Sequence, residues 1–238
     1  MNTAAIPNPV KDVQGDDRWM SQHNRFLLEA KEREPEVIFI GDSILQQLPR
    51  TQFWKRMFEP LHCLNFAIGG DTTQNVLWRV QNGELDFVEP KVIVLLVGTN
   101  NHENTAEEVV GGILELVSCI QQKQQRTHII VMGIPPRGEN PNPLREKIAK
   151  INSSLAMQLE DLKHCTFLAT DPTLFIGHDG KISHMDMHDY LHLTNRGYQK
   201  LCEPLLDLIQ DLLQEFIKVE NTSQDSDSLA GDLAVKDP

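Results

Sequence analysis

Two segments far apart in the sequence carry the residue types that nucleophilic catalysis needs. Ser43 follows Gly41 and Asp42 after an apolar run, so its hydroxyl is expected at a helix start, near backbone N–H groups that can hold a developing oxyanion. Asp189 and His192 stand three residues apart, which lets the carboxylate fix the imidazole tautomer while the second ring nitrogen faces a serine. Each feature alone also fits a helix cap or an exposed turn. The chemistry that such residues would perform, if the fold brings them together, is acyl transfer at a serine.

Two further residues could supply the hydrogen-bond donors that such a reaction requires. Gly70, in a Gly-Gly-Asp run, offers a backbone N–H that an oxyanion can approach closely, and Asn100 offers a neutral side-chain amide. A turn glycine and an Asx turn are the simpler interpretations. The sequence contains neither Gly-x-Gly-x-x-Gly nor Gly-Lys-Ser/Thr, and nucleotide binding is therefore disfavoured.

The order of apolar segments predicts the scaffold that would hold these residues. Short strand-like runs alternate with segments of helical length and period, which is typical of an α/β protein with a parallel sheet and helices on both sides. The expected strands are Val37–Ile40, Cys63–Ala67, Val92–Val97, His128–Met132 and Thr166–Ala169. One expected helix ends with Trp54–Phe58, and the others cover Thr72–Val80, Glu107–Gln121, Pro143–Leu162 and Asn195–Ile217. Because parallel strands end at one edge of a sheet, the polar turns at Ser43, Gly70 and Asn100 are expected to converge there.

Composition limits the possible functions further. The chain has 238 residues, of which 40% are hydrophobic and 24% charged, the balance of a water-soluble globular protein. Lys plus Arg number 22 and Asp plus Glu number 34, so the formal charge is −12, which disfavours nucleic acid and anionic membrane surfaces as partners. No apolar run approaches the ~20 residues of a membrane span, and the start does not resemble a secretory signal, so a cytoplasmic protein without membrane insertion is expected. The four widely spaced cysteines are expected to be free, buried thiols.

In combination, the motifs resemble those of a known hydrolase superfamily. Gly-Asp-Ser at Ser43, Gly-Gly-Asp at Gly70, Gly-Thr-Asn-Asn-His at Asn100 and Asp-x-x-His-Leu-Thr from Asp189 onward stand in the order of the four motif blocks of the SGNH or GDSL-type hydrolases. The resemblance covers the whole body of the chain. It implies a flavodoxin-like three-layer sandwich with a central five-stranded parallel sheet.

Longer stretches narrow the resemblance to one group of these hydrolases. The stretches Gln14–Ser21, Asn100–Glu107 and Asn142–Arg145 look like the catalytic α subunits of cytosolic type I platelet-activating factor acetylhydrolase. This implies a serine esterase that hydrolyses the sn-2 acetyl ester of an ether phospholipid, without a metal or other cofactor. It also implies a homodimer, or a heterodimer with a paralogous catalytic subunit, bound to the lissencephaly-linked WD-repeat β subunit that connects it to dynein.

The same resemblance assigns a role to each site residue. Ser43 would be the nucleophile, His192 the general base and then acid, and Asp189 its orienting partner. The oxyanion hole would be formed by the N–H groups of Ser43 and Gly70 and by the side chain of Asn100, and the acyl pocket would involve Ile44, Thr99 and Leu191.

Three features depart from the family pattern. Leu96 replaces a tryptophan, His188 replaces an aromatic residue, and the loop Thr173–Asp179 is one residue longer. These differences bear on specificity more than on mechanism, and a preference for the short acetyl group is still expected.

Three segments are expected along the chain: an N-terminal arm (1–15), the hydrolase domain (16–218) and an acidic tail (219–238). The segment Val219–Pro238 holds five acidic residues and no aromatic one, so it is expected to be disordered.

Three alternatives stay open at this level. His184, His188 and His192 are spaced by four, with Asp186 and Asp189 between them, which on a helix would suit a metal ion. The chain could instead serve mainly as a structural or regulatory subunit that binds the WD-repeat partner. It could also hydrolyse other short-chain esters, because a fold does not fix a substrate.

Overall fold

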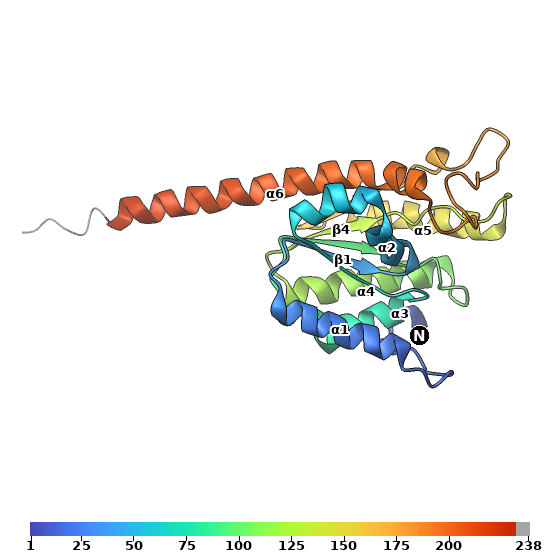
Figure 1. The fold of residues 1–238 in the computed structure, drawn as a ribbon, viewed down its shortest axis with the longest axis horizontal. Coiled ribbons are helices and arrows are strands. Elements are labelled where there is room, and N and C mark those ends of the chain that lie inside the picture. Colours follow the sequence, from blue (N-terminus) through green and yellow to red (C-terminus); the bar gives the residue numbers. More distant parts are fainter. Residues whose placement is uncertain (232–238) are drawn as a thin grey trace, which may run out of the picture.

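Five parallel strands form one sheet at the centre of the protein (Figure 1). The computed structural model describes the backbone of residues 1–231 and the side chains of residues 1–219. The strands are β1 (Val37–Gly41), β2 (Cys63–Ala67), β3 (Val92–Leu96), β4 (His128–Met132) and β5 (Cys165–Leu168). Their order, β2-β1-β3-β4-β5, is that of flavodoxin-like doubly wound folds. The predicted α/β class is therefore confirmed.

Helices cover both faces of the sheet and complete three layers (Figure 1). The helices are α1 (Arg18–Glu32), α2 (Ser43–Gln47), α3 (Thr73–Arg79), α4 (Ala106–Lys123), α5 (Pro143–Leu159) and α6 (Asn195–Gly231). Figure 1 shows α2 and α6 on one face and α1, α3 and α4 on the other, while α5 packs against α4 and β5. This double cover explains why β1 and β3 are fully buried and nearly all aliphatic. Among the described helices, none has the length and apolar character to cross a bilayer.

The sequence locates every strand but misses one helix. β2 and β4 have the predicted bounds, and β5 begins and ends one residue earlier than predicted. Helix α1 was not predicted. It buries His23 together with Phe26 and Ala30, so a polar residue interrupts the apolar stripe by which an amphipathic helix is recognised.

The N-terminal arm packs against helices α3 and α4. Ala4 is fully buried, and its carbonyl oxygen accepts a hydrogen bond of 2.7 Å from the Thr73 hydroxyl. A Cβ atom at Gly112 of α4 would lie 2.5 Å from the same oxygen. Asn2 adds a bond of 2.8 Å to the Glu108 carbonyl. The first residues of the chain therefore belong to the folded body.

Helix α6 continues past the end predicted at Ile217. Ile209 and Leu212 are buried, whereas Ile217 and Val219 are 51% and 64% exposed, and the backbone stays helical to Gly231. Adding a residue to an existing helix gains a hydrogen bond without a new nucleation step. The helical backbone of 219–231 differs from the disorder expected for 219–238, and residues 232–238 lie outside the described part.

All four cysteines are free, as predicted. Three of them are buried, and Cys63 is only partly buried.

A buried ion network joins α1 and α3 to the ends of two strands. Arg79 is fully buried and donates to Asp71 at 2.8 Å, to Glu84, and to the carbonyl oxygens of Phe66 and Gly41 at 2.9 and 3.3 Å. Although burial acts to lower it, the facing carboxylates of Glu84 and Asp71 raise the pKa of Arg79 above its ordinary value. The guanidinium therefore stays charged and holds the carboxyl ends of β1 and β2 together.

Two residues of α1 complete the network. The Trp19 indole donates to Asp71 at 2.7 Å, and the His23 ring lies 3.0 Å from Glu84. The helix that the sequence did not reveal thus covers the buried charges.

We predict that Arg79→Met lowers the free energy of unfolding by about 3 to 5 kcal/mol, because two carboxylates would remain buried without their counter-charge. Urea denaturation measures this loss. Arg25→Met is a matched control, since Arg25 is 61% exposed in its pair with Glu29 and its removal should cost less than about 1 kcal/mol. Equal losses in the two variants would contradict the structural role of Arg79.

Candidate active site

The predicted site residues gather where the winding of the sheet reverses. β1 lies between β2 and β3 in the sheet. The chain runs from β1 to its neighbour β2 and then crosses over to β3, which lies on the other side of β1. Ligands of such α/β proteins commonly bind beyond the carboxyl ends of the strands at this point. Ser43 follows β1 and Asn100 follows β3. Gly41 permits the close approach of these strand ends, because a Cβ atom there would lie 2.0 Å from the Leu96 carbonyl oxygen.

Ser43 stands in a turn that Asp42 fixes. The Asp42 carboxylate accepts the N–H of Ile44 at 2.9 Å and thereby caps α2. Its other oxygen is buried without a hydrogen-bond partner among the described residues. Burial raises the pKa of Asp42 to about 7, while the N–H of Ile44 and the charge of Arg137 act in the opposite direction. Near neutral pH this carboxyl group is therefore partly protonated.

Ser43, His192 and Asp189 form one chain of hydrogen bonds. The Nε2 atom of His192 lies 2.9 Å from the Ser43 hydroxyl, and Nδ1 lies 2.6 Å from an Asp189 carboxylate oxygen. Although partial burial acts to raise it, hydrogen bonds from His192 hold the pKa of Asp189 at about 2. Asp189 is therefore ionised at neutral pH and favours a proton on Nδ1, which leaves Nε2 free to accept the serine proton.

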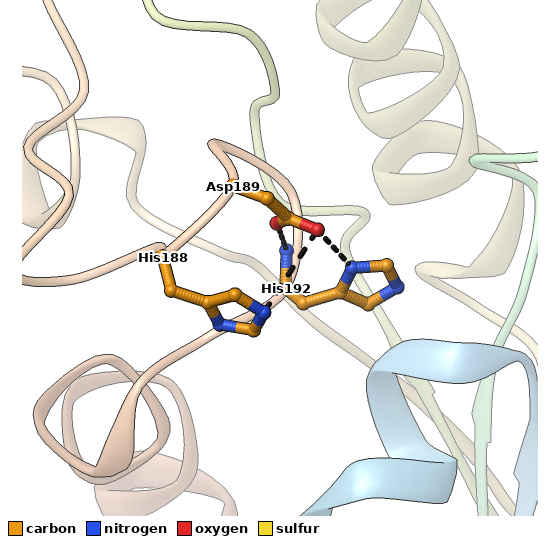
Figure 2. Close-up of side chains that lie close together, drawn as sticks. All are labelled: His188, Asp189 and His192. Carbon is orange, nitrogen blue, oxygen red and sulfur yellow. Dashed lines mark hydrogen bonds and ion pairs between the residues drawn. The ribbon is translucent and has the colours of Figure 1, made fainter.

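A local turn brings Asp189 and His192 onto the same side of the backbone. The second oxygen of Asp189 accepts the N–H groups of Leu191 and His192 at 3.1 and 2.7 Å. These bonds compensate for the left-handed conformation of Tyr190 between them, whose φ is 61°. Figure 2 shows the Asp189 carboxylate directed at the His192 ring and backbone. The three-residue spacing seen in the sequence therefore reflects a turn, not a helix.

The two remaining oxyanion-hole candidates border the same edge of the sheet. Asn100 is half-buried, and its amide donates to the Asp71 carbonyl oxygen at 2.9 Å. Since an amide group carries two hydrogens, one is left for a ligand. Gly70 is exposed with a φ of 86°, and the position of its absent Cβ is open. Asp71 belongs to the buried Arg79 network. Gly70 precedes Asp71 in the chain, and Asn100 donates to the Asp71 carbonyl oxygen. The network therefore helps to position both Gly70 and Asn100.

The residues predicted for an acyl pocket are chain neighbours of other predicted site residues: Ile44 follows Ser43, Thr99 precedes Asn100 and Leu191 precedes His192. Ile44 and Thr99 are buried, and Leu191 is half-buried. Leu96, one of the departures from the family pattern, is buried at the end of β3. A hollow lined by residues of 33–36, 85–91 and 123–127 lies at the opposite edge of the sheet and contains none of the predicted site residues.

Several residues that support the site were not identified from the sequence. The Tyr198 hydroxyl donates to the Ile44 carbonyl oxygen and joins α6 to α2. Arg137 donates to the carbonyl oxygen of Thr99 at 3.0 Å, and its charge acts on both Asp42 and Asp189. Tyr198 could have been noticed in the sequence, because it is a tyrosine at an apolar position of the predicted last helix. Nothing in the sequence distinguished Arg137.

The histidine cluster suggested by the sequence assembles only in part. One ligand atom each from His188, Asp189 and His192 lie within 4.8 Å of one another. Asp186 is instead paired with Arg196 and Lys200 at 3.0 and 2.9 Å. His184 is not a member of the group.

Comparison with known proteins defines the class of protein to which this site belongs. The model of the GDSL-like lipase/acylhydrolase family matches residues 39–200, a range that contains Ser43, Gly70, Asn100, Asp189 and His192. The chain therefore belongs to the GDSL-like lipase/acylhydrolase family, and it is an esterase.

Particular relatives are more similar still. The chain is 55% identical over 222 residues to the platelet-activating factor acetylhydrolase IB subunit alpha2 of Bos taurus and of Homo sapiens, which covers 93% of this chain and 96% of each relative. It is 50% identical over 214 residues to the alpha1 subunit of Bos taurus, which covers 90% of this chain and 92% of the relative. The predicted resemblance is thus confirmed.

Solved structures of low sequence identity share the fold. A GDSL-like lipase from Bacteroides thetaiotaomicron superposes with a TM-score of 0.65 at 18% identity, covering 78% of this chain and 97% of that one. The carbohydrate acetylesterase Est24 from Sinorhizobium meliloti gives a TM-score of 0.59 at 16% identity, covering 75% of this chain and all of that one.

We predict that Asp42→Asn alters the pH dependence of stability. Because burial raises the folded pKa from 3.8 to about 7, the stabilisation from the protonated carboxyl is fully present below pH ~4 and is lost as the pH rises through ~7. The asparagine side chain keeps an oxygen for the N–H of Ile44 but cannot ionise. From pH 5 to pH 8 the free energy of unfolding of the wild type, from urea denaturation, should fall by about 2 to 3 kcal/mol relative to the variant. Parallel pH profiles would contradict this.

Proposed function

We propose that the protein is a serine esterase that releases acetate from the sn-2 position of platelet-activating factor, 1-alkyl-2-acetyl-glycerophosphocholine. The hydrogen-bonded chain from Ser43 through His192 to Asp189 carries the proposal. The 55% identity to subunits named for the hydrolysis of this substrate supports the choice of ester. The alternative within the same chemistry is an esterase of other short-chain esters.

In the first half of the proposed reaction, the Ser43 oxygen attacks the acetyl carbonyl carbon while Nε2 of His192 takes the hydroxyl proton. The ionised Asp189 stabilises the imidazolium that forms. The tetrahedral intermediate then collapses, and His192 gives its proton to the departing sn-2 oxygen of the glycerol backbone. The products of this half are the lysophospholipid and an acetyl ester of Ser43.

In the second half, water attacks the acetyl group and His192 again acts as base. Transfer of the proton back to the Ser43 oxygen releases acetate and restores the site. In both halves the N–H groups of Ser43 and Gly70 and the Asn100 amide would hold the negative oxygen. Such donors are worth about 10²- to 10³-fold in rate each, and the hydrogen bond from the Asn100 amide to the Asp71 carbonyl oxygen supports this role for Asn100, because it restricts the side chain.

Preference for a short acyl group would follow from Ile44, Thr99 and Leu191. Ile44 and Thr99 are already buried against the body, and the hydrogen bonds from Arg137 hold the Thr99 backbone and hydroxyl. A wall fixed in this way cannot retreat to admit a longer chain. Comparable rates on octanoyl and acetyl esters would favour the wider short-chain esterase alternative.

The assembly and location are also part of the proposal. The relatives are named as subunits, which supports a homodimer or a heterodimer with a paralogous catalytic subunit, bound to the lissencephaly-linked WD-repeat β subunit in the cytoplasm. The proposed division of the chain is an N-terminal arm (1–15) whose first residues pack against the domain, a hydrolase domain (16–218) and an acidic tail (219–238).

We predict that Ser43→Ala reduces acetate release from 1-alkyl-2-acetyl-glycerophosphocholine by at least ~10⁴-fold, because the nucleophile is lost. Purified wild type and variant are compared with and without a chelator, and their thermal unfolding shows whether the fold is intact. Turnover by the variant would refute the assignment of Ser43. Loss of wild-type activity in the chelator would instead support the metal-centred alternative.

We predict that Asp189→Asn lowers kcat by up to ~10⁴-fold, because the amide no longer favours the tautomer with a free Nε2. Steady-state kinetics measure kcat and KM. Asp211→Asn removes an exposed carboxylate from α6 and should retain wild-type kinetics. A rate near that of the wild type for Asp189→Asn would show that Asp189 does not orient His192.

A further inference from the structure

The imidazole rings of His188 and His192 both lie near the Asp189 carboxylate (Figure 2). The Nε2 atom of His188 lies 3.9 Å from the same Asp189 oxygen that contacts Nδ1 of His192. The two rings are stacked, with their centroids 5.9 Å apart. The proposed mechanism uses Asp189 and His192 but gives no role to His188.

The donor set matches the preference of divalent transition-metal ions. Imidazole nitrogen and carboxylate oxygen are the usual protein ligands of Zn²⁺ at about 2.0 to 2.2 Å, with water completing the tetrahedron. The three ligand atoms lie within 4.8 Å of one another, so a small side-chain adjustment closes them around one ion. The side chains of His188 and Asp189 are 54% and 46% exposed, which leaves room for that adjustment and for entry from solvent.

We propose that His188, Asp189 and His192 form a binding site for a divalent transition-metal ion, with Zn²⁺ as the best-matched candidate, and that occupation of this site stops the esterase. The inference rests on the proposed function, because His192 is at once a ligand of the ion and the base of the reaction. It differs from the metal-centred alternative, in which an ion would be needed for activity.

The inhibition follows from the two nitrogens of one ring. In the free protein Asp189 favours the proton of neutral His192 on Nδ1. An ion bound at Nδ1 requires that proton to move to Nε2, the atom that lies 2.9 Å from the Ser43 hydroxyl. Nε2 then donates a hydrogen bond and no longer accepts one, so it cannot take the serine proton. No atom is gained or lost in this change of tautomer.

The charges near the site act in both directions. Arg137 lies close enough to act on Asp189 and opposes a cation, whereas the formal charge of −12 favours one. His188 adds the third ligand, which distinguishes this site from an ordinary Asp–His pair. Its removal is therefore the informative change.

Binding is tested by titrating ZnCl₂ into the Ser43→Ala protein in a calorimeter, where no turnover occurs, and by the absorption spectrum of added Co²⁺. We expect one ion per chain and an affinity at least about tenfold lower when His188→Phe is added, since phenylalanine keeps the ring stack but removes the nitrogen. His184→Phe is the matched control, because His184 is exposed nearby and does not belong to the group. Equal affinities in the three proteins would overturn the site.

Inhibition is tested with the catalytically intact chain. Zn²⁺ should inhibit acetate release, a chelator should reverse the effect, and His188→Phe should raise the half-inhibitory concentration by the same factor as it weakens binding, each protein being referred to its own metal-free rate. Binding without inhibition would overturn the switch. Absence of activity in the metal-free wild type would refute the proposed function alone, because the calorimetric result does not depend on turnover.

Discussion

One buried guanidinium fixes the edge of the sheet on which the site is built. Arg79 binds the carbonyl oxygens at the ends of β1 and β2 and the carboxylate of Asp71. The Asp71 carbonyl oxygen in turn holds Asn100 from the end of β3. Because an unpaired charge is costly in the interior, these partners are held at fixed positions. Two of the donors proposed for the oxyanion, Gly70 and Asn100, are therefore positioned by the buried Arg79 network.

Ser43 and His192, the proposed nucleophile and base, are supported in different ways. Ser43 sits between a fully buried strand and the capped start of α2, and α6 reaches the same turn through Tyr198. His192 and Asp189 lie on a partly exposed loop that is held by hydrogen bonds to the Asp189 carboxylate and by backbone hydrogen bonds such as that from His188 to the His192 carbonyl oxygen. The core thus sets the position of the Ser43 hydroxyl, while solvent reaches the His192 and Asp189 side chains. This difference in access is what opens His192 to control by dissolved ions.

Local patterns were sufficient to predict the sheet and the residues at its edge, because aliphatic runs such as Val92–Leu96 and the motif at Ser43 are contiguous in sequence. They were insufficient where a residue's environment comes from distant segments. His23 reads as a surface residue of a polar helix until its partner Glu84 is known, and Arg79 has the same ambiguity. Arg137 becomes informative only because Asp42 and Asp189, far apart in sequence, both lie within reach of its charge.

The hydrogen bond between Ser43 and His192 joins residues 149 positions apart, which has a consequence for synthesis on the ribosome. At translation speeds of about 5–20 residues per second, Ser43 leaves the exit tunnel several seconds before His192 has been made. All five strands and the loop that follows them must be in place before the bond can form. Under the proposed mechanism, a nascent chain therefore stays inert towards esters until His192 has been made and the loop that carries it has folded against Ser43.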